Sequence, residues 1–190
     1  SVSFGNNTYV AADQSGNILV SSDASSWTLK DTDASRLYGV VFGNDIFVAA
    51  GLGLDGAYIV RSTDDGSNWS EENPTLYDRY TTNNFYALTY AENTTSSNND
   101  YFVAVGAKGK IARAPDNGSK FAQSQGNIYE AYRQTENYLL GVAYGNQSFV
   151  AVGEDGKILK GADNGTRNVW ATMTSPTTID LNGVTFGNNT

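Results

Sequence analysis

The stretch VFGNDIFVAAGLGLDGAYIVRSTDDGSNW, residues 41–69, contains three short apolar segments separated by turns rich in Gly, Asn and Asp. These residues favour tight turns because they accept the backbone angles that such turns need. The segments between them are rich in Val, Ile, Phe and Tyr, which is typical of β-strands. The segment at residues 47–50, FVAA, is apolar throughout and predicts a strand covered on both faces. The stretch therefore predicts a meander of strands.

The same pattern recurs along the whole chain. Its leading aromatic residues are spaced by 38, 48, 54 and 42 residues, and they are Phe4, Phe42, Tyr90, Tyr144 and Phe186. The second strand of each full copy has alanine at its third position, which indicates a close neighbouring backbone: Ala11, Ala49, Ala104 and Ala151. We expect one repeat domain over residues 1–190, with repeats at approximately 1–36, 37–84, 85–138 and 139–181 and an extra first strand at 182–190. A period of about 45 residues is typical of blade-type repeats.

A second motif, Ser-x-Asp-x-Gly-x-x-Trp, follows the third strand of each repeat and is complete in STDDGSNW, residues 62–69. The four copies, three of them degenerate, are Ser21, Asp23 and Trp27; Ser62, Asp64, Gly66 and Trp69; Asp116, Gly118 and Phe121; and Asp163, Gly165 and Trp170. In such a turn Asp accepts backbone N–H bonds, Gly supplies a positive φ, and the aromatic residue packs under the hairpin. We therefore expect these residues to form turns rather than a metal or catalytic site.

The motif resembles the Asp-box, or BNR, repeat of β-propellers such as sialidases, sortilin-type receptors and photosystem II assembly factors. The resemblance covers essentially the whole chain, and it implies that the motif is the turn between the third and fourth strands of a blade. Four repeats then predict an all-β propeller of about four four-stranded blades, closed into a ring. An open fragment of a larger propeller, or a stacked β-repeat array, is the alternative.

Composition excludes several classes of function. The formal charge of −8 has the wrong sign for a protein that binds nucleic-acid phosphates, and no apolar run is long enough for membrane insertion. His and Cys are absent, which removes disulfides, thiolate or imidazole metal sites and His-based catalysis. We expect no catalytic residue, no metal and no cofactor. The chain starts with Ser1 and shows no signal peptide, so we expect a mature or excised piece of a longer precursor.

Loops between strands carry other candidate ligands. Three acidic residues at the expected propeller mouth, Asp13, Asp55 and Asp155, suit a cation but lack the spacing of a calcium loop. Sialidases bind a carboxylate with three arginines. Three arginines precede first strands here, but their offsets from these strands differ, which favours solvated loop residues: Arg36, Arg79 and Arg133. Loop tyrosines suit either stacking on sugars or packing between blades, and they are Tyr77, Tyr80, Tyr129, Tyr132 and Tyr138.

Seven Asn-x-Ser/Thr sequences are candidate glycosylation sites: Asn6, Asn68, Asn93, Asn117, Asn146, Asn164 and Asn188. All fall in turns after a first strand or in the Ser-x-Asp motif, and these two kinds of turn lie at the same end of a meandering blade. Sugars attached at these sites would therefore all lie on one face of the fold. The competing explanation is that Asn, Ser and Thr are common turn residues.

The two ends of the sequence are nearly the same, SVSFGNNT at residues 1–8 and GVTFGNNT at residues 183–190. A closed ring of four blades leaves no place for the extra strand, whose candidate self-association residues are Gly183, Val184, Thr185 and Phe186. We expect this strand to displace residues 1–4, to pair with a continuation of the chain, or to be taken up by another copy.

These observations favour a non-catalytic extracellular or cell-surface building block, such as a surface-layer, adhesin or fibril subunit that is glycosylated and self-associating. The alternative is a carbohydrate- or protein-binding propeller of the lectin or receptor type. A divergent glycosidase fragment is less favoured, because no pair of catalytic carboxylates is recognisable.

Overall fold

The computed structural model describes residues 1–54, 56–72, 84–92, 100–115, 135–162 and 170–187. These residues form strands, connected by turns and by two short 3-10 turns, η1 (Ala107–Gly109) and η2 (Glu154–Gly156). The predicted all-β fold is confirmed. None of the helical segments in these ranges has the length and apolarity that crossing a membrane requires.

The strands form four antiparallel sheets, each in chain order, which we call blades 1 to 4. Blade 1 contains β1 (Val2–Gly5), β2 (Thr8–Ala12), β3 (Ile18–Ser21) and β4 (Thr28–Lys30). Blade 2 contains β5 (Arg36–Gly43), β6 (Ile46–Gly53), β7 (Gly56–Ser62) and β8 (Ser70–Glu71). Blade 3, in the described residues, contains β9 (Phe85–Ala91), β10 (Tyr101–Gly106) and β11 (Ile111–Pro115). Blade 4 contains β12 (Leu139–Gly145), β13 (Ser148–Gly153), β14 (Ile158–Ala162) and β15 (Trp170–Thr172).

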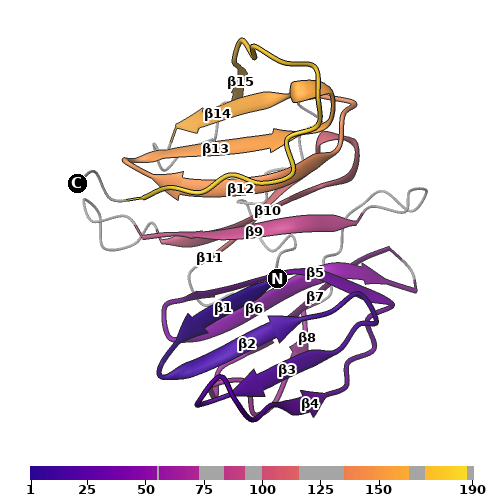
Figure 1. The fold of residues 1–190 in the computed structure, drawn as a ribbon, viewed down its shortest axis with the longest axis vertical. Helices are drawn as coiled ribbons and strands as arrows, with labels where there is room; N and C mark the ends of the chain where they lie inside the picture. The colour runs from indigo at the N-terminus through magenta and orange to yellow at the C-terminus, as the bar shows by residue number, and fades with distance from the viewer. Residues whose placement is uncertain (55, 73–83, 93–99, 116–134, 163–169, 188–190) are drawn as a thin grey trace.

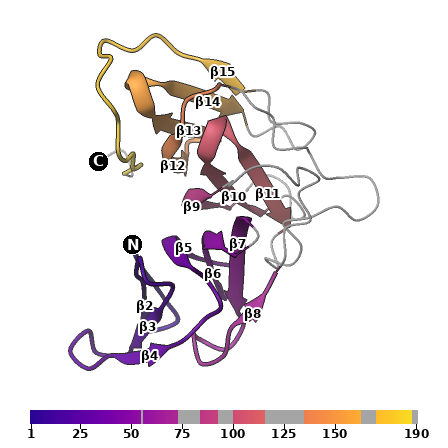
Figure 2. The same ribbon diagram turned by 90° about the vertical axis from the view of Figure 1, so that its right-hand side faces the viewer.

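The first strands of the blades lie side by side, in the order β1, β5, β9 and β12 (Figures 1 and 2). The later strands of each blade lie progressively farther from this row, which is the propeller arrangement. The predicted propeller of four blades is confirmed. The blades follow one another along an open arc, whereas we expected a closed ring. In a closed ring β1 would lie beside β12, but residues 183–186 occupy that place.

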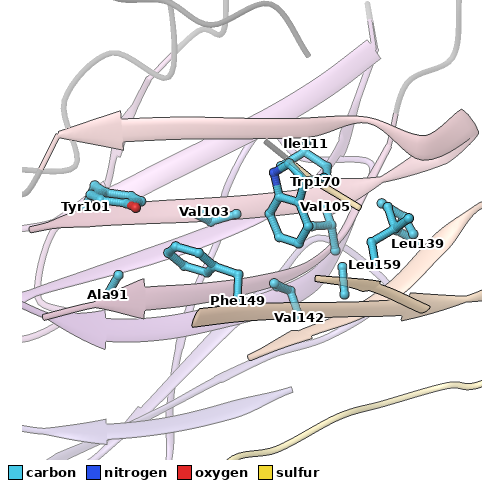
Figure 3. Packing of buried hydrophobic residues seen from close by; sticks show 11 residues of the cluster. Ala91, Tyr101, Val103, Val105, Ile111, Leu139, Val142, Phe149, Leu159 and Trp170 are labelled. Carbon is cyan, nitrogen blue, oxygen red and sulfur yellow. The ribbon is translucent and has the colours of Figure 1, made fainter. Parts of the chain in front are cut away.

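Apolar side chains fill the space between consecutive blades in three clusters. Ala49, Ala104 and Ala151 are fully buried at the centres of their blades. Figure 3 shows the cluster between blades 3 and 4, to which Phe149 and Trp170 contribute rings from blade 4. The second strands β6 and β10 are covered on both faces, as predicted, whereas β2 in blade 1 alternates between buried and half-buried residues.

Glycine allows the inner strands to pack closely. The ring of Phe42 in blade 2 occupies the place where a side chain on Gly5 of blade 1 would lie, and Tyr90 is placed in the same way over Gly43. Any larger residue at either glycine would displace the ring. Blades 2 and 3 therefore each join the preceding blade by an aromatic ring on a glycine.

Candidate binding surfaces

The complete Ser-x-Asp motif forms a hydrogen-bonded turn after β7. The Ser62 hydroxyl donates to Asp64 Oδ1 at 2.8 Å and accepts the Gly66 N–H at 2.9 Å. Asp64 also accepts the backbone N–H of Asn68 at 2.9 Å and its side-chain amide at 2.7 Å. The Trp69 indole donates to the carbonyl of Gly66, which has a φ of +82°. The side chains of the motif are thus used in holding the turn.

The first copy of the motif keeps this geometry although it lacks the glycine. Asp23 Oδ1 accepts the backbone N–H groups of Ser25 and Ser26 at 2.8 and 2.7 Å, and the Ser21 hydroxyl at 3.1 Å. Ala24 takes the positive φ, and its carbonyl accepts the Trp27 indole N–H. In the other two copies Trp170 is a buried member of blade 4, while Asp116, Gly118, Phe121, Asp163 and Gly165 lie outside the described residues.

Acid is expected to weaken the turn at Asp64. Hydrogen bonds from the side chain and backbone of Asn68, and then from Ser62, hold the pKa of Asp64 below its ordinary value. The stabilisation from this carboxylate is therefore complete above the unfolded pKa of about 3.9 and is lost as the pH falls through the lower folded pKa. Asp64→Asn should lower Tm by about 2 °C at pH 7, a small effect because the group is exposed.

The difference in Tm should shrink as the pH falls through the folded pKa of Asp64, because the parent carboxylate then becomes protonated as well. Asp31→Asn, at another exposed aspartate, serves as the control. Thermal unfolding followed by circular dichroism across this pH range checks the prediction, and a Tm difference that stays constant with pH would contradict it.

The inner strands carry β-bulges at matching positions. Tyr38 is the extra residue between Leu37 and Gly39 of β5, and Tyr86 is the extra residue in β9, opposite the shift between Val105 and Gly106. A bulge changes the direction of a side chain relative to its regular neighbours. Tyr38 and Tyr86 each precede the leading aromatic residue of their repeat by four positions.

Three tyrosines form a row near the start of the first strands of blades 2, 3 and 4. We call it the tyrosine row: Tyr38, Tyr86 and Tyr138. The ring centroids of Tyr38 and Tyr86 lie 5.1 Å apart edge to face, and those of Tyr86 and Tyr138 lie 6.0 Å apart in a stack. All three are half-buried. Burial raises the pKa of Tyr86, so its phenol stays neutral at physiological pH. The row thus presents aromatic surface with hydroxyl groups.

Polar groups surround the tyrosine row. The Tyr38 side chain beside the exposed Arg36 guanidinium raises the pKa of Arg36. Glu154 Oε2 accepts the backbone N–H of Tyr138 at 2.9 Å. The Asn84 amide donates to the Tyr86 hydroxyl at 3.5 Å, and its own buried oxygen has no hydrogen-bond partner among the described residues. Arg79, Arg133 and the tyrosines Tyr77, Tyr80, Tyr129 and Tyr132 lie outside those residues.

The acidic loop residues do not gather into a metal site in the described ranges, which contain no suitable group of three acidic ligands. Asp13 accepts the backbone N–H groups of Ser15 and Asn17, and Asp155 accepts the side-chain amide of Asn137. Bonds from the Asn17 backbone and then its side chain lower the pKa of Asp13. Asp55 lies outside the described residues.

Three of the candidate glycosylation sites are described, and all three are exposed: Asn6, Asn68 and Asn146. Asn6 and Asn146 lie in two-residue hairpin turns with positive φ. The Asn6 amide donates to Asp65 Oδ1 at 3.2 Å, which places the first turn of blade 1 beside the Ser-x-Asp turn of blade 2. The two turns therefore lie side by side, at the same end of the strands in neighbouring blades. Asn93, Asn117, Asn164 and Asn188 lie outside the described residues.

Residues 181–187, which we call the docked segment, lie against β12 as the first strand of a further blade would. Phe186 covers Gly145 as Phe42 covers Gly5. The Leu181 N–H donates to the Gly153 carbonyl at 3.0 Å, matching the 3.1 Å bond from Leu37 to Asp13 that joins blades 1 and 2. In the described residues the docked segment pairs with no second strand, and Phe186 is 51% exposed.

A family model described as the DUF6242 beta propeller domain matches residues 1–156. The chain belongs to this family. No curated protein matches the chain. The description of the family as a beta propeller agrees with the four blades of the structure.

Solved structures share the fold at low sequence identity. The chain is similar to the computationally designed Ika8 protein (13% identity, TM-score 0.66), covering 99% of this chain and 52% of that one. It is similar to YCF48 bound to D1 peptide (16%, TM-score 0.66), covering 99% and 57%. It is also similar to the WD40 β-propeller domain of Doa1 (14%, TM-score 0.66), covering 96% and 55%. The chain thus spans slightly more than half the length of these proteins.

Sequence reasoning selected Tyr138 of the tyrosine row and overlooked the other two members. Tyr38 and Tyr86 lie within predicted first strands, where an aromatic residue is an ordinary core residue. Their common position, four residues before the leading aromatic residue, was the available signal.

Proposed function

We propose that the chain is a non-catalytic propeller module that binds another polypeptide, with the tyrosine row as the contact surface. The observation that carries this proposal is the continuous aromatic contact from Tyr38 through Tyr86 to Tyr138, built from three consecutive blades. Tyrosine is enriched at protein interfaces because its ring supplies contact area and its hydroxyl supplies a hydrogen bond.

The chemistry of the row suits an extended peptide with proline or aromatic side chains. Such side chains stack on tyrosine rings, while the hydroxyl groups and the Arg36 guanidinium are donors for peptide carbonyl or carboxylate oxygens. A structure of YCF48, which has the same fold, contains a bound peptide. That complex supports the class of ligand and no particular sequence.

The test is selection from a phage-displayed random 12-residue peptide library on the 190-residue chain. Selected peptides should converge on a motif, and Tyr86→Ala should weaken their binding at least about tenfold, as expected for a central aromatic contact. Tyr9→Ala is the matched control, because Tyr9 is a half-buried tyrosine of blade 1 that contacts Phe4 away from the row. A selection without a motif, or equal binding by both variants, would contradict the proposal. A glycan array tests the carbohydrate-binding alternative on the same variants.

A second candidate function is the extracellular, glycosylated and self-associating building block. The docked segment favours it, since this strand lies in place for a blade whose other strands the described residues do not supply. The exposure of Asn6, Asn68 and Asn146 is compatible with attached sugars. Intact-glycopeptide mass spectrometry of protein from its native source tests whether sugars are attached. Unmodified asparagines at all of these sites would contradict a glycosylated building block.

A further inference from the structure

We propose that the tyrosine row binds an extended polypeptide segment in which an acidic and a basic side chain stand about four residues apart, the acidic one at Arg36 and the basic one beside Tyr138. This inference rests on the proposed function and specifies the ligand of the same surface. It is carried by the order in which charged groups follow one another across the first strands of blades 2 to 4 and the docked segment.

Four residues occupy equivalent positions at the start of successive first strands. Each precedes the leading aromatic residue of its repeat by six positions, and they are Arg36, Asn84, Tyr138 and Asp180. The strands that carry them lie close together, since a Cβ on Gly39 of β5 would lie 3.4 Å from the backbone of Ala87 in β9. A Cβ on Gly141 of β12 would lie 2.9 Å from the backbone of Gly183 in the docked segment. The four positions therefore form a line across the blades, from a cation through two neutral side chains to an anion.

Negative charge gathers beside Tyr138. Glu154 Oε2 accepts the Tyr138 N–H at 2.9 Å. Burial is the main cause of the raised pKa of Tyr86, and the charge of Glu154 adds to it, so this carboxylate lies close enough to act on the central ring of the row. The next residue, Asp155, donates its N–H to Asp180 Oδ1 at 3.0 Å. We call Glu154, Asp155 and Asp180 the acidic corner.

Positive charge lies at the other end of the tyrosine row, where the exposed Arg36 guanidinium is beside the Tyr38 side chain. The neighbouring acidic residue, Asp13, uses its carboxylate to hold Ser15 and Asn17 in its own turn. Within the described residues, no ion pair joins Arg36 or the acidic corner to an opposite charge. A ligand can therefore pair with either end without breaking an existing ion pair.

The length of the row determines the spacing of the charges on the ligand. Successive ring centroids lie 5.1 and 6.0 Å apart along it. An extended chain advances roughly 3.3 Å per residue, so about three or four residues pass over the three rings. Neutral side chains that stack on tyrosine suit this middle part. A charged side chain just before it and another just after it then reach the opposite charges of the protein.

The two charged ends fix the direction in which the ligand lies. A ligand turned end for end would bring its acidic side chain to the acidic corner and its basic side chain to Arg36, and such like-charge contacts lower affinity. Exposed ion pairs contribute little affinity each, whereas central aromatic contacts contribute much more. The rings therefore supply most of the affinity, and the charges select the direction and the register.

The test repeats the peptide selection on charge variants of the 190-residue chain. Peptides selected on the parent should carry an acidic residue on one side of a neutral centre and a basic residue on the other. Arg36→Glu should replace the acidic residue of the motif with a basic one. Glu154→Gln combined with Asp180→Asn should remove the preference for the basic residue. Both of these substitutions keep an oxygen that can accept the existing hydrogen bonds.

Fluorescence polarisation with a labelled peptide selected on the parent measures the same effect as an affinity. Arg36→Glu should weaken its binding at least about tenfold, and high salt should reduce this difference. Lys160→Glu is the matched control, because it makes the same charge reversal at an exposed residue of β14, paired with Val150 and Ala171. It should change the affinity less than about twofold, since salt screens distant charges.

The remaining outcomes separate this inference from the proposed function. A selection without a motif would refute both. A motif of neutral residues alone, or one whose charges stay the same on Arg36→Glu, would retain the tyrosine row as a peptide-binding surface and refute the charge order. Equal weakening by Arg36→Glu and Lys160→Glu would also refute it, because the net charge of the chain, and not the position of Arg36, would then be responsible.

Discussion

Replacing Phe149 with alanine is expected to lower the free energy of unfolding by about 3–5 kcal/mol. Phe149 is fully buried, and its ring contacts Tyr144 and Trp170 of its own blade and Tyr101 of blade 3, with centroids 4.7, 5.9 and 5.5 Å away. The truncation leaves a cavity between two sheets, which the surrounding strands fill only in part. It removes three aromatic contacts together with the apolar burial.

Equilibrium unfolding in urea measures this loss. Phe4→Ala is the control, because Phe4 is an aromatic residue of blade 1 whose ring is half exposed, and its loss should cost less than about 1 kcal/mol. Equal effects of the two substitutions would show that the cluster between blades 3 and 4 is not a packed core.

Enlarging the centre of blade 3 should also destabilise the chain. Ala104 is fully buried, is paired with Leu88 and Ala112, and belongs to the cluster between blades 2 and 3. Ala104→Leu adds three carbon atoms where the facing sheet leaves no room, at an expected cost of about 1–3 kcal/mol.

Ala171→Leu makes the same chemical change at an exposed position of β15 and should alter the unfolding temperature little. Differential scanning calorimetry compares the two variants. An unchanged Tm for Ala104→Leu would mean that β10 is not enclosed by the neighbouring sheet.

The sequence predicted the strands and blades because their signals are local. Each signal lies within a few neighbouring residues and recurs along the chain. The signals are the Gly-Asn turns, the continuous apolar second strands and the alanine at their third position, such as Ala49. The opening of the arc was not predictable in this way. The angle between blades depends on side chains that meet across the seams, such as Phe42 and Gly5, and the number of repeats does not determine it.

The binding surface was predictable only in part for a related reason. The hydrogen-bonding roles of Asp23 and Asp64 follow from short-range turn chemistry. Tyr38 and Tyr86 meet because two bulges in different blades occur at the same level, although the residues are far apart in sequence. A strand pattern indicates alternating faces, but it does not indicate where an extra residue interrupts the alternation.

The aromatic ring on a glycine has a consequence for how such a chain can grow. Within a repeat, Phe42 fits the glycine of the unit before it and Gly43 receives the ring of the unit after it. The ring and the glycine that form the two halves of the joint are thus adjacent residues, so adjacent codons encode them. A tandem duplication of the blade 2 unit would insert a blade whose two joints already match its neighbours, without any compensating substitution. Changes in blade number are therefore accessible in single genetic steps.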